Sequence, residues 1–354
     1  MSKPKGLGLG GFLIGIGSGW FLFQSLQVTD ETFSWALIIF GSSIVLSNLL
    51  NYFSPGMNLG GFISGATFGL IVALIMTNGF SIFTGADIFN RYDYRVDDPR
   101  SFTGTLSSDT ISFSTINVNG DITVSTWEEN TYKVLVTVTG KGTSNEDATN
   151  ILSEAVVTLD DSKGIAKQEL ELDIDIPTSK WNRFEVDVEV SLPEGVTLEL
   201  DAKTTNGNLR VEDILGGDLK TTTTNGDCRY VNVNASSITG STTNGGIYGI
   251  FDASDMSGST TNGNINIDLY SAISGEYDLS TTNGNVDVNV QESSDNGFKL
   301  DCSLSNGQIT FDVNDLDYTV NTNKNKIARS DGYTTSSIQI DIESSTTNGD
   351  IDIN

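Results

Sequence analysis

The chain of 354 residues contains no histidine and only two cysteines, Cys228 and Cys302. Without histidine it can form neither a histidine-dependent catalytic triad nor a histidine-ligated metal site. Two cysteines provide no disulfide framework, so buried apolar side chains must hold the fold. The repeat described below separates the two cysteines by about four strand-to-strand steps, roughly 15–20 Å. A disulfide needs Cα atoms within about 7 Å, so we expect two buried free thiols.

Basic residues are also scarce. The chain has 19 Lys and Arg against 46 Asp and Glu, a formal net charge of −27. The charges before Val96 cancel, so the whole excess lies in residues 96–354. Such a field repels nucleic acid and anionic lipid, and we expect no nucleic-acid partner. Acidic pairs such as Asp350 and Asp352 alternate along strands and lack the glycine spacing of a calcium loop. A calcium-binding face is therefore only a weak alternative: we predict no metal site, and calcium dependence stays open.

Charge of either sign is missing from two long stretches, between Lys5 and Asp30 and between Glu31 and Asp87. The segments of about 6–28, 33–53 and 59–83 each reach the roughly 20 apolar residues that cross a bilayer core. They predict a membrane domain over 1–86 with three transmembrane helices. Glycines such as Gly65 and Gly69 suit close helix packing in lipid.

The few charges near these segments predict their orientation. Lys3 and Lys5 are the only basic residues before Arg91, so the N-terminus is expected to stay in the cytoplasm. Three spans then place the residues after about 84 outside the cytoplasm, as part of an integral protein of the plasma membrane.

What the sequence has in abundance is the phrase Thr-Thr-Asn-Gly, with a looser copy at Leu304–Gly307 and an isolated Asn-Gly at Asn119. Successive asparagines from Asn206 to Asn306 are 19, 19, 18, 21 and 23 residues apart. A period near twenty indicates one supersecondary unit that stacks repeatedly. The predicted turn residues are Asn119, Gly120, Asn206, Gly207, Asn225, Gly226, Asn244, Gly245, Asn262, Gly263, Asn283, Gly284, Asn306, Gly307, Asn348 and Gly349.

Apolar residues alternate with polar ones on both sides of each turn, so each unit of the repeat domain, 200–354, reads as strand, turn, strand. Ile265, for example, is expected to point inward between Ile247 and Val286. The asparagines are expected to need a glycine partner because glycine accepts positive φ. An outward ladder of hydroxyl groups is predicted at Thr205, Thr224, Thr243, Thr261 and Thr282.

Two architectures fit these units, and both are mainly β. Asn-Gly between alternating strands is typical of hairpins, which favours an antiparallel β-meander. Identical residues in identical columns favour a parallel β-solenoid, because like side chains then stack about 4.8 Å apart. We predict the solenoid and keep the meander as the alternative. Residues 96–200 are expected to form a β-rich cap module with a short helix near Ser144–Ala155, covering the first exposed strand edge.

The stretch Asn117–Trp127, the segment Leu192–Val196 before the first Thr-Thr-Asn-Gly, and the closing residues Gly332–Asn354 resemble a bacterial and archaeal β-repeat family named for “putative adhesins”. That family is a domain of unknown function, related to the C-terminal domains of LiaF-type envelope-stress membrane proteins. The resemblance covers about 100–354. The interval Gln308–Ser345 departs from it, because an Asn-Gly is missing there and Lys324, Lys326 and Arg329 cluster.

The resemblance implies a cell-surface scaffold or adhesin that binds a glycan or a protein. An envelope-stress regulator acting through membrane partners and an ice- or surface-binding Ser/Thr array are the alternatives. Arrays of this kind usually build binding surfaces rather than catalytic clefts. We therefore expect no enzymatic activity, no catalytic residues and no cofactor. The ligand and the oligomeric state stay open.

Overall fold

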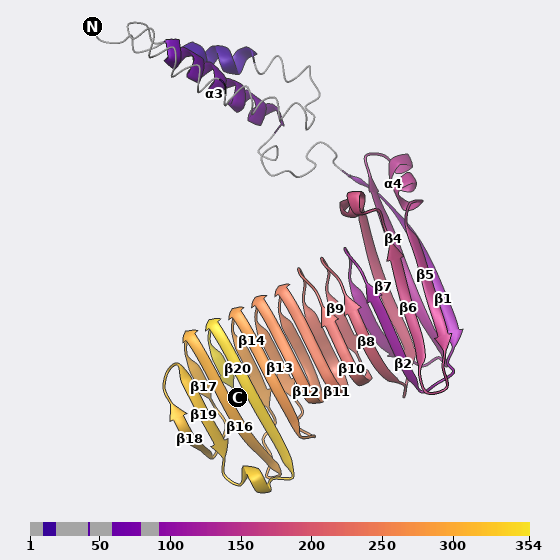
Figure 1. Ribbon diagram of the computed structural model, residues 1–354, viewed down its shortest axis with the longest axis vertical. Coiled ribbons are helices and arrows are strands. Elements are labelled where there is room, and N and C mark those ends of the chain that lie inside the picture. Colours follow the sequence, from indigo (N-terminus) through magenta and orange to yellow (C-terminus); the bar gives the residue numbers. More distant parts are fainter. Residues whose placement is uncertain (1–9, 19–41, 43–58, 79–91) are drawn as a thin grey trace, which may run out of the picture. The chain divides into compact units, whose positions relative to one another are not determined.

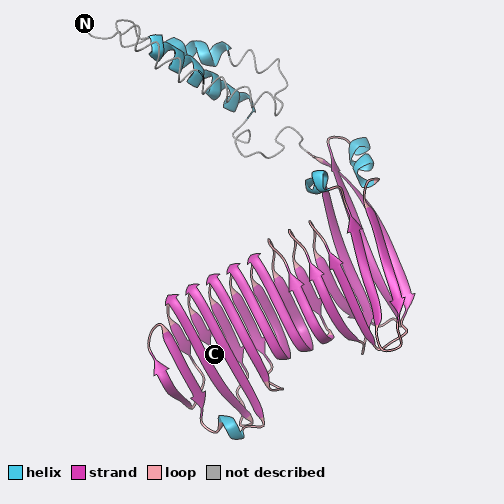
Figure 2. Ribbon diagram, in the orientation of Figure 1, coloured by secondary structure: helices cyan, strands magenta, loops and turns pink. Residues whose placement is uncertain are grey.

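The computed structural model describes residues 10–18, 42, 59–78 and 92–354. The chain divides into two compact units, Met1–Arg91 and Tyr92–Asn354. The second unit is built almost entirely of strands that lie side by side as successive rungs (Figures 1 and 2).

In the first unit, residues 10–18 form a helix and α3 spans Leu59–Asn78. These helices approach each other through glycine: a Cβ on Gly15 would lie 2.0 Å from the Ala66 carbonyl oxygen, and one on Gly69 would lie 2.3 Å from that of Phe12. Within residues 10–18, 42, 59–78 and 92–354, no helix is both long and apolar enough to cross a membrane. The three predicted spans are therefore not found, although most of 6–28 and 33–53 lies outside the described residues.

The strands of the second unit form two rows that face each other. The first row runs in space β5, β6, β2, β8, β10, β11, β12, β14, β20, β16, β19, β18. The bounds are β5 Val156–Lys163, β6 Gln168–Asp175, β2 Thr110–Ile116, β8 Thr197–Lys203, β10 Leu215–Thr222, β11 Cys228–Asn244, β12 Ile247–Asn262, β14 Gly275–Asn283, β20 Ile338–Asn348, β16 Asn296–Asn306, β19 Asn325–Ser330 and β18 Leu316–Asn321.

The second row runs β1, β4, β7, β3, β9, β11, β12, β13, β15, β21, β17. Strands β11 and β12 belong to both rows, because each turns from the second row into the first. The remaining bounds are β1 Tyr94–Thr105, β4 Thr131–Gly142, β7 Phe184–Pro193, β3 Ile122–Trp127, β9 Leu209–Glu212, β13 Ile265–Leu269, β15 Val286–Val290, β21 Ile351–Ile353 and β17 Ile309–Phe311.

The repeat strands pair in parallel, with equivalent residues opposite each other. Ile247 lies opposite Ile265, and Ile265 lies opposite Val286. The predicted parallel stack is therefore confirmed and the antiparallel meander is wrong. All three side chains are buried, and they belong to one continuous core between the two rows.

The stacking order differs from the order along the chain. The last unit, β20 and β21, pairs with β14 and β15 on one side and with β16 and β17 on the other. It thus lies between two units that precede it in the sequence. The interval Gln308–Ser345, where the sequence lacks an expected Asn-Gly, connects β17 to this displaced last unit. Within it, β18 and β19 form an antiparallel hairpin on β16 beyond the last rung, and the short η3 (Tyr333–Thr335) leads back to β20.

Both cysteines are free and buried, as predicted. Burial raises the pKa of the Cys228 thiol to about 11 and that of Cys302 to about 12. The inserted unit places five steps between the rung of Cys228 and that of Cys302, rather than the expected four, counted along β11, β12, β13, β15, β21 and β17.

The residues of the predicted cap module, 96–200, form most of β1, all of β2 to β7 and the start of β8. Its helix α4 spans Asn145–Leu152. The Ser144 side chain accepts a hydrogen bond from the Asp147 backbone N–H at 3.1 Å and so caps the start of the helix. A 3₁₀ helix, η2 (Thr178–Arg183), precedes β7.

Candidate functional site

The predicted turns form one edge of the stack, where strands of the first row pass into strands of the second. We call this line of turns the asparagine corner. Each asparagine except the first, Asn119, donates a side-chain hydrogen bond to the side-chain oxygen of the asparagine on the neighbouring rung, at 2.7–2.9 Å. In spatial order the ladder is Asn119, Asn206, Asn225, Asn244, Asn262, Asn283, Asn348 and Asn306.

Beside the ladder, the first threonine of each phrase points inward. Its hydroxyl donates to the carbonyl oxygen of the glycine one rung earlier, as Thr242 does to Gly226 at 2.9 Å and Thr281 does to Gly263 at 2.9 Å. These threonines are 1–6 % exposed, so the bond satisfies a buried hydroxyl and a turn carbonyl together. Sequence reasoning missed this role. The recurrence of threonine where the strand alternation places an inward side chain was the available signal.

The turn glycines are required for a reason other than the one predicted. The left-handed region is occupied by Gly120, Gly226, Gly307 and Gly349, but not by Gly263. A Cβ on Gly263 would instead lie 1.8 Å from the carbonyl oxygen of Gly245. Because successive turns approach this closely, the corner has no room for any side chain at Gly263. The expectation of positive φ at every turn was therefore wrong.

The predicted outward ladder is exposed along its whole length at Thr205, Thr224, Thr243, Thr261 and Thr282. Because of the inserted unit, the row continues through Thr347 before it reaches Ser305. Strand spacing sets these side chains about 4.8 Å apart. The asparagine ladder holds the turns beneath them, so the hydroxyl row is a regular and rigid polar surface.

Two positions after each ladder asparagine, a second set of bonds crosses the rungs. The Asn264 side-chain oxygen accepts from the Asn285 backbone N–H at 2.9 Å, and that of Asn285 accepts from the Asp350 backbone N–H at 2.9 Å. Gly246 has no side chain to continue this line toward Asn264. Asn264 is exposed, yet it also ties two rungs together.

Carboxylates dominate the outer faces of the rows. Asp278, Glu343 and Asp301 are exposed and lie opposite one another on three successive rungs. On the other row, burial raises the pKa of Asp287, and the neighbouring Asp352 and Asp268 push it in the same direction. Among residues 10–18, 42, 59–78 and 92–354, no group of three or more acidic or sulfur side chains is arranged to hold a metal ion.

A family model described as Toastrack DUF4097 matches residues 109–354. The chain belongs to the Toastrack family. The match begins just before β2, so it includes the cap module from that point and every rung of the repeat.

Several solved structures are similar to this Toastrack chain. A “putative cell adhesion protein” from Clostridium sporogenes is 14 % identical, with a TM-score of 0.30, and the match covers 72 % of this chain and 99 % of that one. A “putative adhesin” from Bacteroides fragilis is 12 % identical, with a TM-score of 0.35 and coverage of 73 % and 97 %. A “putative lipid binding protein” from Parabacteroides distasonis is 12 % identical, with a TM-score of 0.34 and coverage of 73 % and 96 %. Among curated proteins, none matches the chain.

Proposed function

We propose that this Toastrack protein is a membrane-anchored scaffold or adhesin that binds a glycan or a protein outside the cytoplasm. The observation that supports the proposal is the asparagine corner, a straight polar surface with hydroxyl groups at fixed intervals. Each of its inner rungs is bonded to the rungs on both sides. A surface that is ordered before binding loses little conformational entropy when a ligand docks.

The anchor rests on the first unit and on the sequence around it. Leu13, Ile14 and Phe68 are apolar and 58–62 % exposed. Large exposed apolar side chains are costly in water and favourable in lipid. The close approaches at Gly15 and Gly69 suit helices that associate in a membrane. With Lys3 and Lys5 on the cytoplasmic side, the Toastrack domain would lie outside.

The proposal includes the absence of enzymatic activity. The rows of carboxylates follow from the outward positions of alternating strands, and such rows require no catalytic role. Scaffolding also accounts for the repeated, uniform surface, which a single reaction centre would not need.

Two experiments test this function. Protease added to intact cells should remove the Toastrack domain while leaving the N-terminal unit, and complete protection until lysis would contradict the outside location. Cells that carry the chain should adhere to glycan- or protein-coated surfaces more than cells that lack it. Replacing Thr224, Thr243 and Thr261 together with alanine should reduce that adhesion, since it removes the centre of the hydroxyl row.

The alternatives make different predictions. A LiaF-type stress regulator would act through its first unit, so fusing residues 1–91 to another soluble domain would preserve signalling. An ice-binding array would produce thermal hysteresis. The ice-binding alternative is disfavoured by the line of side chains two positions before the exposed threonines, which contains Ser241 and Ser259. These two serines are half-buried, and their hydroxyls are 3.3 Å apart in a hydrogen bond to each other. That row therefore gives ice a poorer match than a flat, fully exposed hydroxyl surface.

A further inference from the structure

A cleft of about 650 Å³ lies at the cap-module end of the asparagine corner. Its floor is the outer face of β7 and β3, with Glu185, Asp187 and Glu189 along β7. Trp181 and Asn182 of η2 line it as well, and Asn119, the first member of the ladder, reaches its margin. The volume is in the range of pockets that hold a small organic ligand or part of a larger one.

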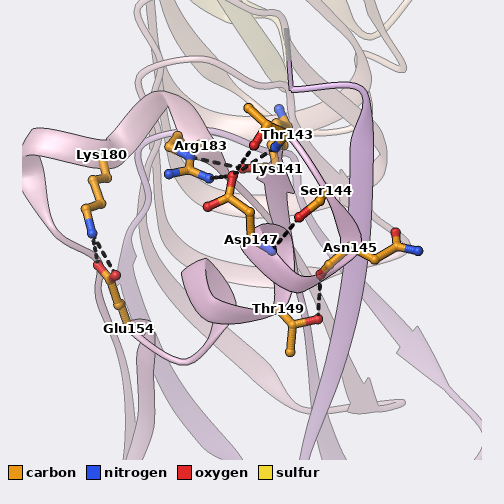
Figure 3. Close-up of polar contacts among 9 residues, drawn as sticks. All are labelled: Lys141, Thr143, Ser144, Asn145, Asp147, Thr149, Glu154, Lys180 and Arg183. Carbon is orange, nitrogen blue, oxygen red and sulfur yellow. Dashed lines mark hydrogen bonds and ion pairs between the residues drawn. The ribbon is translucent and has the colours of Figure 1, made fainter. Parts of the chain in front are cut away.

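The segment that carries Trp181 is fixed from both sides, as Figure 3 shows for its charged neighbours. Lys180 forms an ion pair with Glu154 at 2.7 Å. Arg183 donates to Asp147 at 2.6 Å and to the Lys141 backbone carbonyl at 3.1 Å. Asn119 donates its side-chain N–H to the Trp181 backbone carbonyl at 2.7 Å. The backbone that carries Trp181 is therefore held in place before any ligand arrives.

The polar groups of the cleft differ in how far they are already occupied. Lys141 pairs with Glu185 at 2.8 Å, and Asp187 accepts from the Asp121 backbone N–H at 2.9 Å. Within residues 92–354, no side-chain hydrogen bond or ion pair involves Asn182 or Glu189, and both are exposed. These two side chains offer an amide and a carboxylate to a ligand.

An aromatic side chain beside amides and carboxylates matches the chemistry of a sugar. One face of a pyranose ring presents C–H groups that pack on an indole, while its hydroxyls both donate and accept hydrogen bonds. Trp181 keeps 46 % of its surface exposed, although large apolar groups are usually covered. The four carboxylates that line the cleft, Asp121 among them, outnumber the single ammonium of Lys141. This excess of negative charge disfavours ligands that carry acidic groups.

We propose that this cleft binds a carbohydrate without acidic groups, through Trp181, Asn182 and Glu189. The inference deepens the proposed function and rests on it for its biological setting, because it names the class of ligand and a site for it next to the corner. A glycan chain seated in the cleft would begin at Asn119 and could continue along the exposed threonine row.

The test uses the full chain, kept in solution with a polyoxyethylene detergent that has no sugar headgroup. The labelled protein is applied to a printed array of neutral, amine-bearing and acidic oligosaccharides. We expect retention on neutral or amine-bearing glycans and none on acidic ones. Trp181→Ala should weaken that retention by at least about tenfold, the size expected when an aromatic anchor is removed.

Two further variants separate binding from folding. Trp181→Phe keeps an aromatic ring and should retain part of the binding. Tyr270→Ala removes an aromatic side chain that is 45 % exposed on another part of the surface, and it should bind like the original chain. Equal retention by Trp181→Ala and the original chain, retention of acidic glycans, or no retention at all would overturn the proposal. Adhesion that depends on the threonine row but not on Trp181 would overturn the cleft while leaving the proposed function intact.

Discussion

Replacing Ile265 with alanine provides the most direct measure of what holds the rungs together. Ile265 is fully buried, between Ile247 and Val286, which are also fully buried. The change removes three carbon atoms, worth about 0.8 kcal/mol each when buried, or about 2.4 kcal/mol together. A closely packed stack can relax only partly around the cavity, which raises the expected cost to about 3–4 kcal/mol of the free energy of unfolding.

The assay is denaturant unfolding of the unit 92–354, with the neighbouring asparagines as matched controls. Asn266→Ala should change the free energy of unfolding by less than about 0.5 kcal/mol, since this exposed side chain has no hydrogen bond among the described residues. Asn264→Ala should cost about 0.5–1.5 kcal/mol, because it loses the bond from the Asn285 backbone N–H. If Ile265→Ala were as mild as Asn266→Ala, the inward and outward faces would be misassigned, and with them the stacked core.

Three further predictions concern the turns, the carboxylates and the cap module. Gly263→Ala should destabilise the unit by more than about 1 kcal/mol, because the new Cβ would overlap the Gly245 carbonyl oxygen. The control is Gly195→Ala, where φ is +80° but the space is open, and it should destabilise the unit less. If thermal unfolding gave the reverse order, φ rather than space would govern the turn. Glu343→Gln should stabilise the unit by about 0.2–1 kcal/mol, because it relieves repulsion from Asp278 and Asp301, and the stabilisation should be larger at low salt. The control Glu212→Gln loses the ion pair with Arg210 and should not stabilise the unit. A stabilisation by Glu343→Gln that is equal at all salt concentrations would argue against repulsion. The hydrogen bond from Arg183 lowers the pKa of Asp147 from 3.8 to about 2, so the stabilisation by the ionised carboxylate is complete above about pH 3.8 and is lost as pH falls toward 2. Urea unfolding should show that the original chain is more stable than Asp147→Asn at pH 5 and that this difference shrinks at pH 2.5. A difference that is the same at both pH values would contradict this linkage.

The rungs could be predicted from the sequence because burial and turn geometry act within one unit of about twenty residues. The column that contains Ile265 is apolar in every unit, and the strand alternation follows from it directly. The helix beginning after Ser144 was predictable for a similar reason, since its cap is a local hydrogen bond.

The features that could not be predicted depend on contacts between units. The spacing of the repeats along the sequence does not reveal that β20 and β21 lie between β14 and β16 and their partners. Each Thr-Thr-Asn-Gly unit can pair equally well with any other unit, so the stacking order is not encoded in the repeat itself. The clash that excludes a side chain at Gly263 involves a carbonyl 18 residues earlier, so no local rule contains it. The cleft near Trp181 combines residues from η2, β3 and β7, and only the folded cap module brings them together.

The inserted unit has a consequence for how the protein is made. Strands β16 and β17, with the hairpin of β18 and β19 on β16, leave the ribosome before β20 and β21. However, β16 and β17 can join the stack in their final positions only when β20 and β21 arrive. Until then β14 and β15 present open parallel edges, which are sites where strands of other chains can attach. Biosynthesis therefore passes through an intermediate in which the segment 296–337 waits for the segment 338–354. Slowing translation just before Ile338 should prolong that intermediate and increase the chain's dependence on chaperones.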